Sequence, residues 1–229
     1  MGVSAGSDLI QDGLVYSVDA TDKNSYPGSG TAWNDLVHKN NGTLTNGPTF
    51  VSAVGGTDYI NLDGTNDHIE VGNVAEIKTA INETFSICFW VRPNTGGSGY
   101  RCVFGFMNGD NTAGGTRRYK FWVGDDSNFA GPECTSDATD NVWCQIVGTS
   151  DGSTLRIYFN GVQEDTESRA GCGDITAAGN IRLGCHAGIT ADGNRYHKGG
   201  IGNVQVYNRT LSAVEVTQNF KIQRIRYGV

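Results

Sequence analysis

The sequence predicts an all-β protein, a two-sheet antiparallel sandwich with one short C-terminal helix, and three observations lead to this prediction. Glycine accounts for 33 of the 229 residues, about twice its usual share, and it supplies the positive φ angles of tight turns. Short apolar runs follow one another with turn signals between them, and strand patterns do not alternate with helix patterns. Aromatic residues make up 10% of the chain, too many for a disordered segment, and the length suits one domain.

Strands are expected where short apolar or alternating runs lie between turn residues. In the run 85–91 every second residue is apolar, so these residues share one face of a strand. Asn160-Gly161 joins two such runs and is typical of a type I′ hairpin turn, and a second hairpin is predicted around 63–67. The predicted strands are 14–20, 43–45, 59–62, 68–71, 85–91, 100–107, 118–123, 142–149, 155–159, 162–164, 180–184 and 202–207.

The last part of the chain carries the pattern of the one predicted helix. Ser212 and Glu215 have the spacing of a capping box, in which each side chain accepts a hydrogen bond from the other residue's backbone N–H. Val216 and Phe220 lie about one turn apart on one face, and Gly228 stands where the helix has stopped. The sequence therefore predicts a helix that begins after Ser212.

The domain organisation and the charge limit the possible partners. Residues 1–12 are small and polar and are predicted to form an N-terminal arm, and residues 13–229 are predicted to form one domain. The formal net charge of −7 argues against nucleic-acid binding, because phosphate backbones are repelled. No apolar stretch approaches the ~18 residues of a membrane span. The start of the chain lacks a signal peptide, so we expect synthesis in a reducing compartment.

Six cysteines allow a disulfide or a metal-binding interpretation. Cys88 and Cys144 lie inside apolar runs, where core packing is the favoured interpretation. Cys172 and Cys185 end two segments that are linked by a turn-rich stretch and are the better candidates for a disulfide, although fifteen pairings are possible for six cysteines. A zinc set of Cys172, Cys185, His186 and His197 matches no familiar zinc-finger spacing.

The acidic residues point to cation binding rather than catalysis. The densest carboxylate cluster, Glu164-Asp165-Thr166-Glu167, places Glu164 and Asp165 on opposite faces of a strand, which does not suit a glycosidase pair. We therefore expect no enzymatic activity. Asp63, Asp67 and Asn203 are candidate calcium ligands, because calcium takes carboxylate and amide oxygens. The alternative is that Asp-Gly here is only a turn former.

Aromatic and basic residues in the loops and at the C-terminal end are candidates for partner binding. The first group could stack on and hydrogen-bond a sugar or a peptide, with solvated loops as the alternative; it comprises Tyr100, Arg101, Arg118, Arg195 and Tyr196. The second group comprises Lys221, Arg224 and Arg226. These three charges either complement the dipole at the C-terminal end of the helix or dock on an acidic partner.

With these residues described, the chain resembles the laminin-G-like, concanavalin A-like lectin jelly-roll domain over residues 13–229. The resemblance rests on the motifs at 13–20, 62–69, 85–91, 143–147, 151–155, 159–161 and 202–212. The motifs at 26–33, 41–49, 215–220 and 226–228 resemble the version found in tailed-phage structural proteins. The resemblance implies two sheets of six or seven strands and a non-enzymatic module that binds glycans or proteins, often with loop calcium. Many family members have Asp where this chain has Asn203.

The resemblance leads to two functional hypotheses. The first is a virion structural protein on the particle surface, a capsid decoration or fibre-tip module made in the host cytoplasm. Its partners would be capsid, portal or tail proteins, with a homo-oligomer as an open possibility. The second is a carbohydrate-binding adhesin that recognises host surface glycans. Neither hypothesis requires a cofactor, and calcium is left open.

Overall fold

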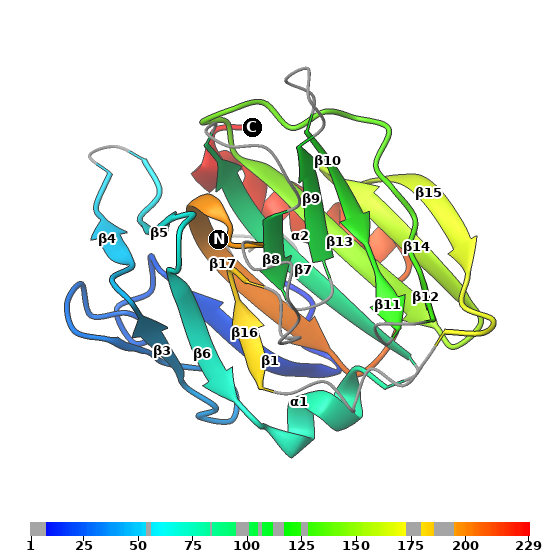
Figure 1. Cartoon of the computed structure of the whole chain (residues 1–229), viewed down its shortest axis with the longest axis horizontal. Coiled ribbons are helices and arrows are strands. Elements are labelled where there is room, and N and C mark those ends of the chain that lie inside the picture. The colour runs from blue at the N-terminus through cyan, green and yellow to red at the C-terminus, as the bar shows by residue number, and fades with distance from the viewer. Residues whose placement is uncertain are drawn as a thin grey trace, which may run out of the picture.

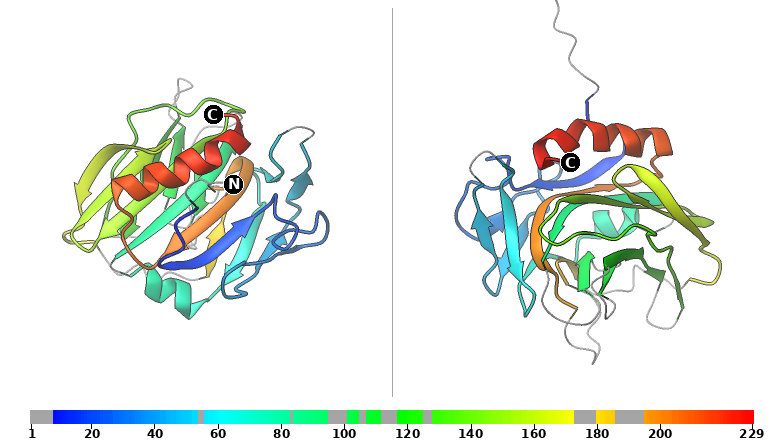
Figure 2. Two further views of the ribbon diagram at one scale, coloured as in Figure 1. Left: turned by 180° about the vertical axis from the view of Figure 1, so that it is seen from behind. Right: turned by 90° about the horizontal axis from the view of Figure 1, so that it is seen from above.

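Two antiparallel sheets face each other in the computed structural model, and helix α2 (Ala213–Tyr227) lies on the outer face of one of them (Figures 1 and 2). The structure describes residues 8–53, 56–82, 84–94, 101–104, 107–111, 117–124, 128–172, 180–185 and 195–229, with the backbone alone at 101, 107–111, 117 and 129. This architecture confirms the predicted fold class, a two-sheet jelly-roll sandwich with a C-terminal helix.

The eight-stranded sheet, called sheet A, has the order β15-β14-β13-β7-β17-β5-β4, and β1 pairs with the second half of β17. Its strands are β1 (Leu14–Asp19), β4 (Thr49–Val51), β5 (Tyr59–Asp63), β7 (Thr84–Pro93), β13 (Cys144–Asp151), β14 (Thr154–Phe159), β15 (Val162–Ser168) and β17 (Lys198–Tyr207).

The seven-stranded sheet, called sheet B, has the order β10-β9-β8-β16-β6-β3-β2. Its strands are β2 (Ala32–Trp33), β3 (Gly42–Thr45), β6 (His68–Gly72), β8 (Arg101–Phe104), β9 (Met107–Asn111), β10 (Arg117–Phe121) and β16 (Ile181–Leu183). A separate pair joins β11 (Val123–Gly124) to β12 (Phe129–Ala130).

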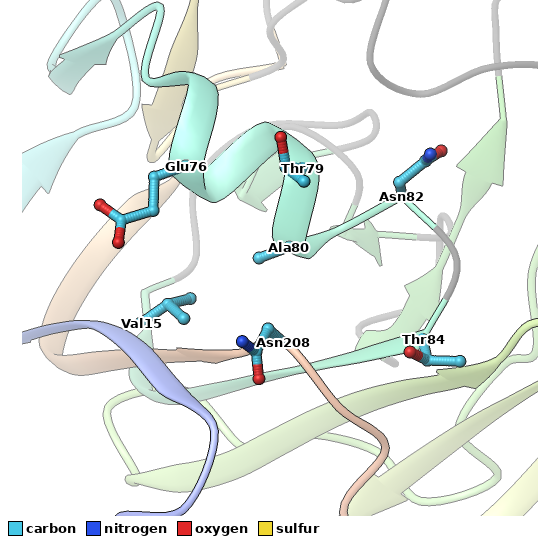
Figure 3. A pocket seen from close by; sticks show the side chains of 7 residues that line it. All are labelled: Val15, Glu76, Thr79, Ala80, Asn82, Thr84 and Asn208. Carbon is cyan, nitrogen blue, oxygen red and sulfur yellow. The ribbon is translucent and has the colours of Figure 1, made fainter.

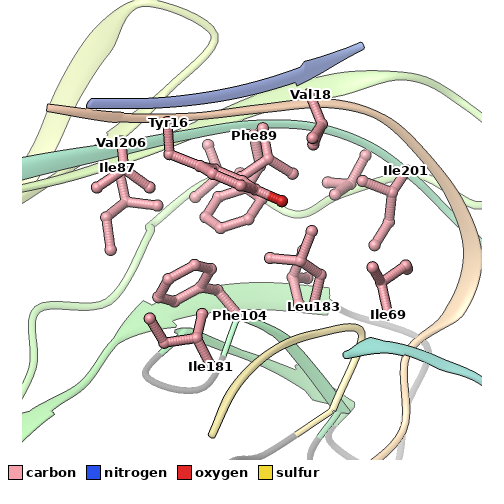
Figure 4. Packing of buried hydrophobic residues seen from close by; sticks show 14 of the residues in the cluster. Tyr16, Val18, Ile69, Ile87, Phe89, Phe104, Ile181, Leu183, Ile201 and Val206 are labelled. Carbon is pink, nitrogen blue, oxygen red and sulfur yellow. The ribbon is translucent and has the colours of Figure 1, made fainter. Parts of the chain in front are cut away.

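The main hydrophobic core fills the space between the two sheets (Figure 4). Alternate residues of each strand point into it, as period-two alternation requires. Sheet A contributes Tyr16, Val18, Ile87, Phe89, Ile201 and Val206, and sheet B contributes Ile69, Phe104, Ile181 and Leu183. The apolar face predicted for 85–91 is thus the inner face of β7.

Helix α2 covers the outer face of sheet A and begins and ends as predicted. The Ser212 hydroxyl accepts from the Glu215 backbone N–H while the Glu215 carboxylate accepts from the Ser212 N–H, and Gly228 closes the helix in the left-handed conformation. The ring of Tyr227 stacks on Trp90 of β7 with centroids 4.0 Å apart, and Trp90 Nε1 donates to Gln223 Oε1 at 2.7 Å. A second apolar cluster lies in this layer and includes Cys88.

Residues 8–12, which the sequence assigned to the arm, lie against α2 and β17. The Ile10 N–H donates to Asn219 Oδ1 at 3.0 Å, and the Tyr207 hydroxyl donates to the Ile10 carbonyl at 3.0 Å. Arg209 forms an ion pair with Asp12 at 2.9 Å. These contacts make residues 8–12 part of the folded domain.

Local turn chemistry predicted one of the two hairpins correctly. Asn160 and Gly161 have φ angles of 48° and 79°, as a type I′ turn requires, and join β14 to β15. The predicted hairpin around 63–67 is wrong, because β5 pairs with β17 and β4 in sheet A whereas β6 pairs with β16 and β3 in sheet B. This turn is a corner at which the chain passes from one sheet to the other.

The structure also contains a second helix that the sequence analysis missed, α1 (Ala75–Ala80), between β6 and β7. Its N-cap residue, Val74, makes no side-chain capping bond, so the usual helix-start signal is missing. Ile77 is buried and anchors the helix against the core between the sheets. The outward side of α1 therefore faces the edge of the sandwich.

The six cysteines are free thiols in the structure, so the predicted Cys172–Cys185 disulfide is absent. Cys172 lies beside Ala130 and Glu167, whereas Cys185 lies beside Arg182 and Glu70 of sheet B. Cys144 is buried, as predicted. Burial raises the pKa of the Cys144 thiol to about 12, which keeps it protonated and unreactive at neutral pH.

Candidate functional site

The strand register separates the three predicted calcium ligands. Asp63 lies opposite Lys198 on β17, while Asn203, five residues further along β17, lies opposite Trp90 and Asp19. Five residues of a strand span about 17 Å, so Asn203 does not share an ion with the residues at the corner. The predicted three-residue set is therefore wrong. Within the described ranges, no group of three or more His, Cys, Asp or Glu side chains is arranged to hold a metal.

The two corner carboxylates bind the backbone of their own turn. Asp63 Oδ1 accepts from the Thr65 N–H at 2.7 Å, and Asp67 Oδ2 accepts from the Asp63 N–H at 3.0 Å. The hydrogen bond from Thr65 lowers the pKa of Asp63, whereas burial raises the pKa of Asp67. The turn-forming alternative thus accounts for both residues, and calcium binding by the domain stays a prediction. His186, one of the four residues of the zinc set considered above, lies outside the described residues.

Those of the predicted aromatic and basic loop residues that the structure describes lie on or beside the neighbouring strands β8, β9 and β10 of sheet B. Tyr100 and the side chain of Arg101 lie outside the described residues. Arg118, on the edge strand β10, forms an exposed ion pair with Asp137 at 3.1 Å. Arg195 and Tyr196 lie beside β8, where the Arg195 carbonyl accepts from the Cys102 N–H, and the Tyr196 ring lies 6.3 Å from the His68 ring.

The C-terminal basic group is divided between two roles. Arg226 Nη1 binds Asp19 at 2.7 Å and its Nη2 donates to the Tyr227 hydroxyl at 2.8 Å, so this guanidinium stabilises the packing of α2 on sheet A. Arg226 thus has a structural role within the domain, and its docking role stays a prediction. Lys221 and Arg224 are exposed.

The carboxylates of β15 hold a neighbouring segment of the chain. Glu164 Oε2 accepts from the backbone N–H groups of Thr135 and Ser136 at 2.8 and 2.9 Å. Asp165 and Glu167 accept from further N–H groups of the segment 131–136 in the same way. The three carboxylates therefore have a structural role, because each one accepts hydrogen bonds from backbone N–H groups.

A pocket of about 570 Å³ with a mixed polar and apolar lining lies at the edge of the sandwich beside α1 (Figure 3). We call it the α1 pocket. Figure 3 shows side chains from α1, from β1, from the start of β7 and from the residue after β17 around one space. Its described lining residues are Val15, Glu76, Thr79, Ala80, Asn82, Thr84 and Asn208. The volume lies within the range of small-molecule sites, about 300–1,000 Å³.

Glu76, in the first turn of α1, is held from the side of the loop 34–41. His38 Nε2 lies 3.3 Å from Glu76 Oε1, and Asn40 Nδ2 donates to Glu76 Oε2 at 3.1 Å. A carboxylate in the first turn of a helix is also favoured by the helix dipole. These contacts fix the carboxylate at the pocket while its side chain remains 45% exposed.

The loop 34–41 is held in turn by one buried carboxylate. Asp35 Oδ1 accepts from the N–H groups of Ser17 and Val37, and its Oδ2 accepts from those of His38 and Asn40, all at 2.9–3.1 Å. A carboxylate with four backbone donors determines the loop conformation, because every acceptor position is used. Asp35 thus positions the two residues that contact Glu76.

The opposite rim of the α1 pocket comes from the ends of β7 and β17. The Asn208 N–H donates to the Gly13 carbonyl at 2.8 Å, which fixes the residue directly after β17. Asn82 accepts a hydrogen bond at its carbonyl from the Arg169 guanidinium, which also donates to Ser150 Oγ at 3.2 Å. The two amide side chains of the rim are exposed, so a ligand can reach them.

The sequence analysis did not identify the α1 pocket. The run Asp35 to Asn41 has the polar composition of a loop held by a side chain, and this signal was available. No local signal connects Val15, Glu76 and Asn208, because these residues meet only after both sheets have formed.

Two antiparallel sheets that face each other around one core, with the strand order described above, define the architecture of a jelly-roll sandwich. The chain belongs to the concanavalin A-like lectin/glucanase superfamily: a laminin G family model, described as Concanavalin A-like lectin/glucanases superfamily, matches residues 63–217. This match confirms the fold family that the sequence motifs resembled. A comparison with curated protein sequences found no match. No helix of the described residues is long and apolar enough to cross a membrane.

Solved structures with the same fold include enzyme-associated and toxin domains. Domain 4 of AbnA, a GH43 extracellular arabinanase from Geobacillus stearothermophilus solved with arabinotriose, has a TM-score of 0.66 at 16% identity, over 90% of this chain and 97% of that one. The binding domain of Paraclostridial Mosquitocidal Protein 1 has a TM-score of 0.67 at 17% identity, over 91% and 52%. The receptor binding domain of botulinum neurotoxin D has a TM-score of 0.67 at 15% identity, over 94% of this chain and 54% of that one. This chain thus spans about half of each toxin structure, and these likenesses show the fold alone.

Proposed function

We propose that this chain is a non-enzymatic, lectin-like module that binds carbohydrate in the α1 pocket and is displayed on the surface of a virus particle. The observation that carries the carbohydrate part is the lining of the pocket. Hydroxyl and amide groups can each donate and accept hydrogen bonds, as sugar hydroxyls do, and Val15 and Ala80 add apolar surface. The arabinotriose complex of a domain with the same fold supports the proposal.

A glycan array probed with the full-length protein tests carbohydrate binding. We expect binding to at least one glycan class, and no binding across a broad set of bacterial and host polysaccharides would overturn the proposal. A parallel array with EDTA tests the calcium expectation. Unchanged binding would mean that the site works without calcium, and lost binding would assign calcium to it.

The absence of catalysis is tested on the same polysaccharides by reducing-sugar release. We expect none, because the β15 carboxylates bind backbone N–H groups. Release that Glu164→Gln abolishes would make the protein an enzyme.

The virion part of the proposal rests on the phage-like sequence motifs. The exposed residues Lys221 and Arg224 of α2 offer a face for a capsid, portal or tail protein. Quantitative mass spectrometry of particles from the source tests this part. Tens to hundreds of copies would indicate a head decoration and a few copies a fibre tip, while absence from the particles would refute virion display.

A further inference from the structure

We infer that the α1 pocket selects sugars by charge, so that it accepts neutral sugars, binds amino sugars more tightly and rejects acidic sugars such as uronic acids. This inference rests on the proposed function, because it names the substrate class of the same pocket. It starts from Glu76, the one charged side chain among the described residues that line the pocket.

The Glu76 carboxylate has acceptor capacity left for a ligand. An ionised carboxylate has about four lone-pair positions. His38 lies at one oxygen and Asn40 donates to the other, so each oxygen keeps an open position. A ligand hydroxyl or ammonium group can donate to such an oxygen, whereas a ligand carboxylate has no proton to donate and carries the same charge.

The other polar groups of the pocket do not favour an anion over a neutral ligand. Thr79 and Thr84 have hydroxyl groups, and Asn82 and Asn208 have uncharged amides. These groups can donate a hydrogen bond to a sugar hydroxyl or accept one from it. They therefore give affinity for sugars in general, and the charge preference comes from Glu76.

The nearby arginines are already engaged. The Arg169 guanidinium lies behind Asn82, where it donates to the Asn82 carbonyl and to Ser150 Oγ. Arg209 is bound by Glu215 and Asp12. Neither arginine is among the described lining residues of the pocket, so neither offers an acidic sugar a direct ion pair.

The size of the effect follows from Coulomb's law. Two charges about 6 Å apart in a half-exposed site, where the effective dielectric constant is about 40–80, change the affinity by about three- to tenfold. We expect a neutral sugar to bind three- to tenfold more tightly than its uronic acid counterpart. The amino sugar should gain a similar factor over the neutral one.

The test uses sugars that differ in charge alone. Oligomers of glucose, glucosamine and glucuronic acid with the same linkage, and the equivalent galactose series, are titrated by calorimetry into the wild type and into Glu76→Gln. We expect Glu76→Gln to bind the three members of a series within about twofold of one another. Glu133→Gln is the matched control: Glu133 pairs with Lys120 on β10 at 2.8 Å, away from the pocket, and the wild-type selectivity should persist.

A second variant separates charge selection from loss of the site. Asn208→Ala removes an uncharged group of the rim and should weaken all three sugars by a similar factor, about fivefold. Acidic sugars bound as tightly as neutral ones, or unchanged selectivity in Glu76→Gln, would each overturn the inference and leave the proposed function standing. Unchanged affinity in Asn208→Ala would place the sugar outside the α1 pocket and overturn both. Failure of the wild type to bind any glycan would instead overturn the proposed function itself.

Discussion

The substitution Asp35→Asn tests how the α1 pocket is built. Asp35 is 5% exposed, and its side chain accepts four backbone hydrogen bonds, two at each carboxylate oxygen. Asparagine has the same shape, but one of its two terminal atoms is an NH₂ donor. In either orientation of the amide, two backbone N–H groups of the network face a donor instead of an acceptor.

The expected loss of stability follows from those two groups. A buried N–H without an acceptor costs about 1–3 kcal/mol. His38 is exposed, so water can accept a hydrogen bond from its N–H and reduce this cost. We therefore expect the free energy of unfolding to fall by about 2–3 kcal/mol. With an m-value of about 3 kcal/mol/M, the urea midpoint would fall by about 1 M.

Urea unfolding followed by tryptophan fluorescence measures this midpoint, and hydrogen exchange at His38 and Asn40 reports on the loop itself. Both amides should exchange faster in Asp35→Asn, and sugar binding should weaken because Glu76 loses its support. Asp22→Asn is the control, since Asp22 accepts from Asn24 through Oδ1, which asparagine keeps. A urea midpoint within about 0.3 M of the wild-type value, a difference comparable to the error of such measurements, would refute the role given to Asp35.

Two further predictions concern the rest of the domain. The bond to Arg209 lowers the pKa of Glu215 to about 2 from its ordinary 4.5, so its stabilising contribution is complete above pH 4.5 and is lost as the pH falls towards 2. Glu215→Gln should therefore flatten the fall in urea midpoint over this window, and an unchanged pH profile would contradict the assignment. Gly148→Ala should lower the free energy of unfolding by about 1–3 kcal/mol, because its Cβ would lie 2.4 Å from the Phe121 ring; a thermal midpoint equal to that of the wild type would contradict this packing.

Local signals in the sequence predicted the elements that they encode directly. The Asn160-Gly161 turn needs two positive φ angles, and both are present. The capping box at Ser212 and the left-handed Gly228 bound α2 as expected. In each case the physical cause lies within a few residues, so the pattern and the structure coincide.

Pairing between distant strands was not encoded in this way. A turn such as 63–67 looks the same whether its flanking strands pair or diverge, and here they enter different sheets. The register of β17 then carried Asn203 away from Asp63. Partners for Arg226 and for the cysteines likewise depended on which chain segments became neighbours.

The sequence by itself thus determined the sandwich class, the main strands, the C-terminal helix and the family, because alternation, turns and caps act over short distances. Only the tertiary structure decided the sheet order, the short uncapped helix α1 and the α1 pocket. The pocket unites Val15, Glu76 and Asn208, which are far apart in the chain. Such a site exists only once long-range packing has overcome the entropy of closing the loops between its residues.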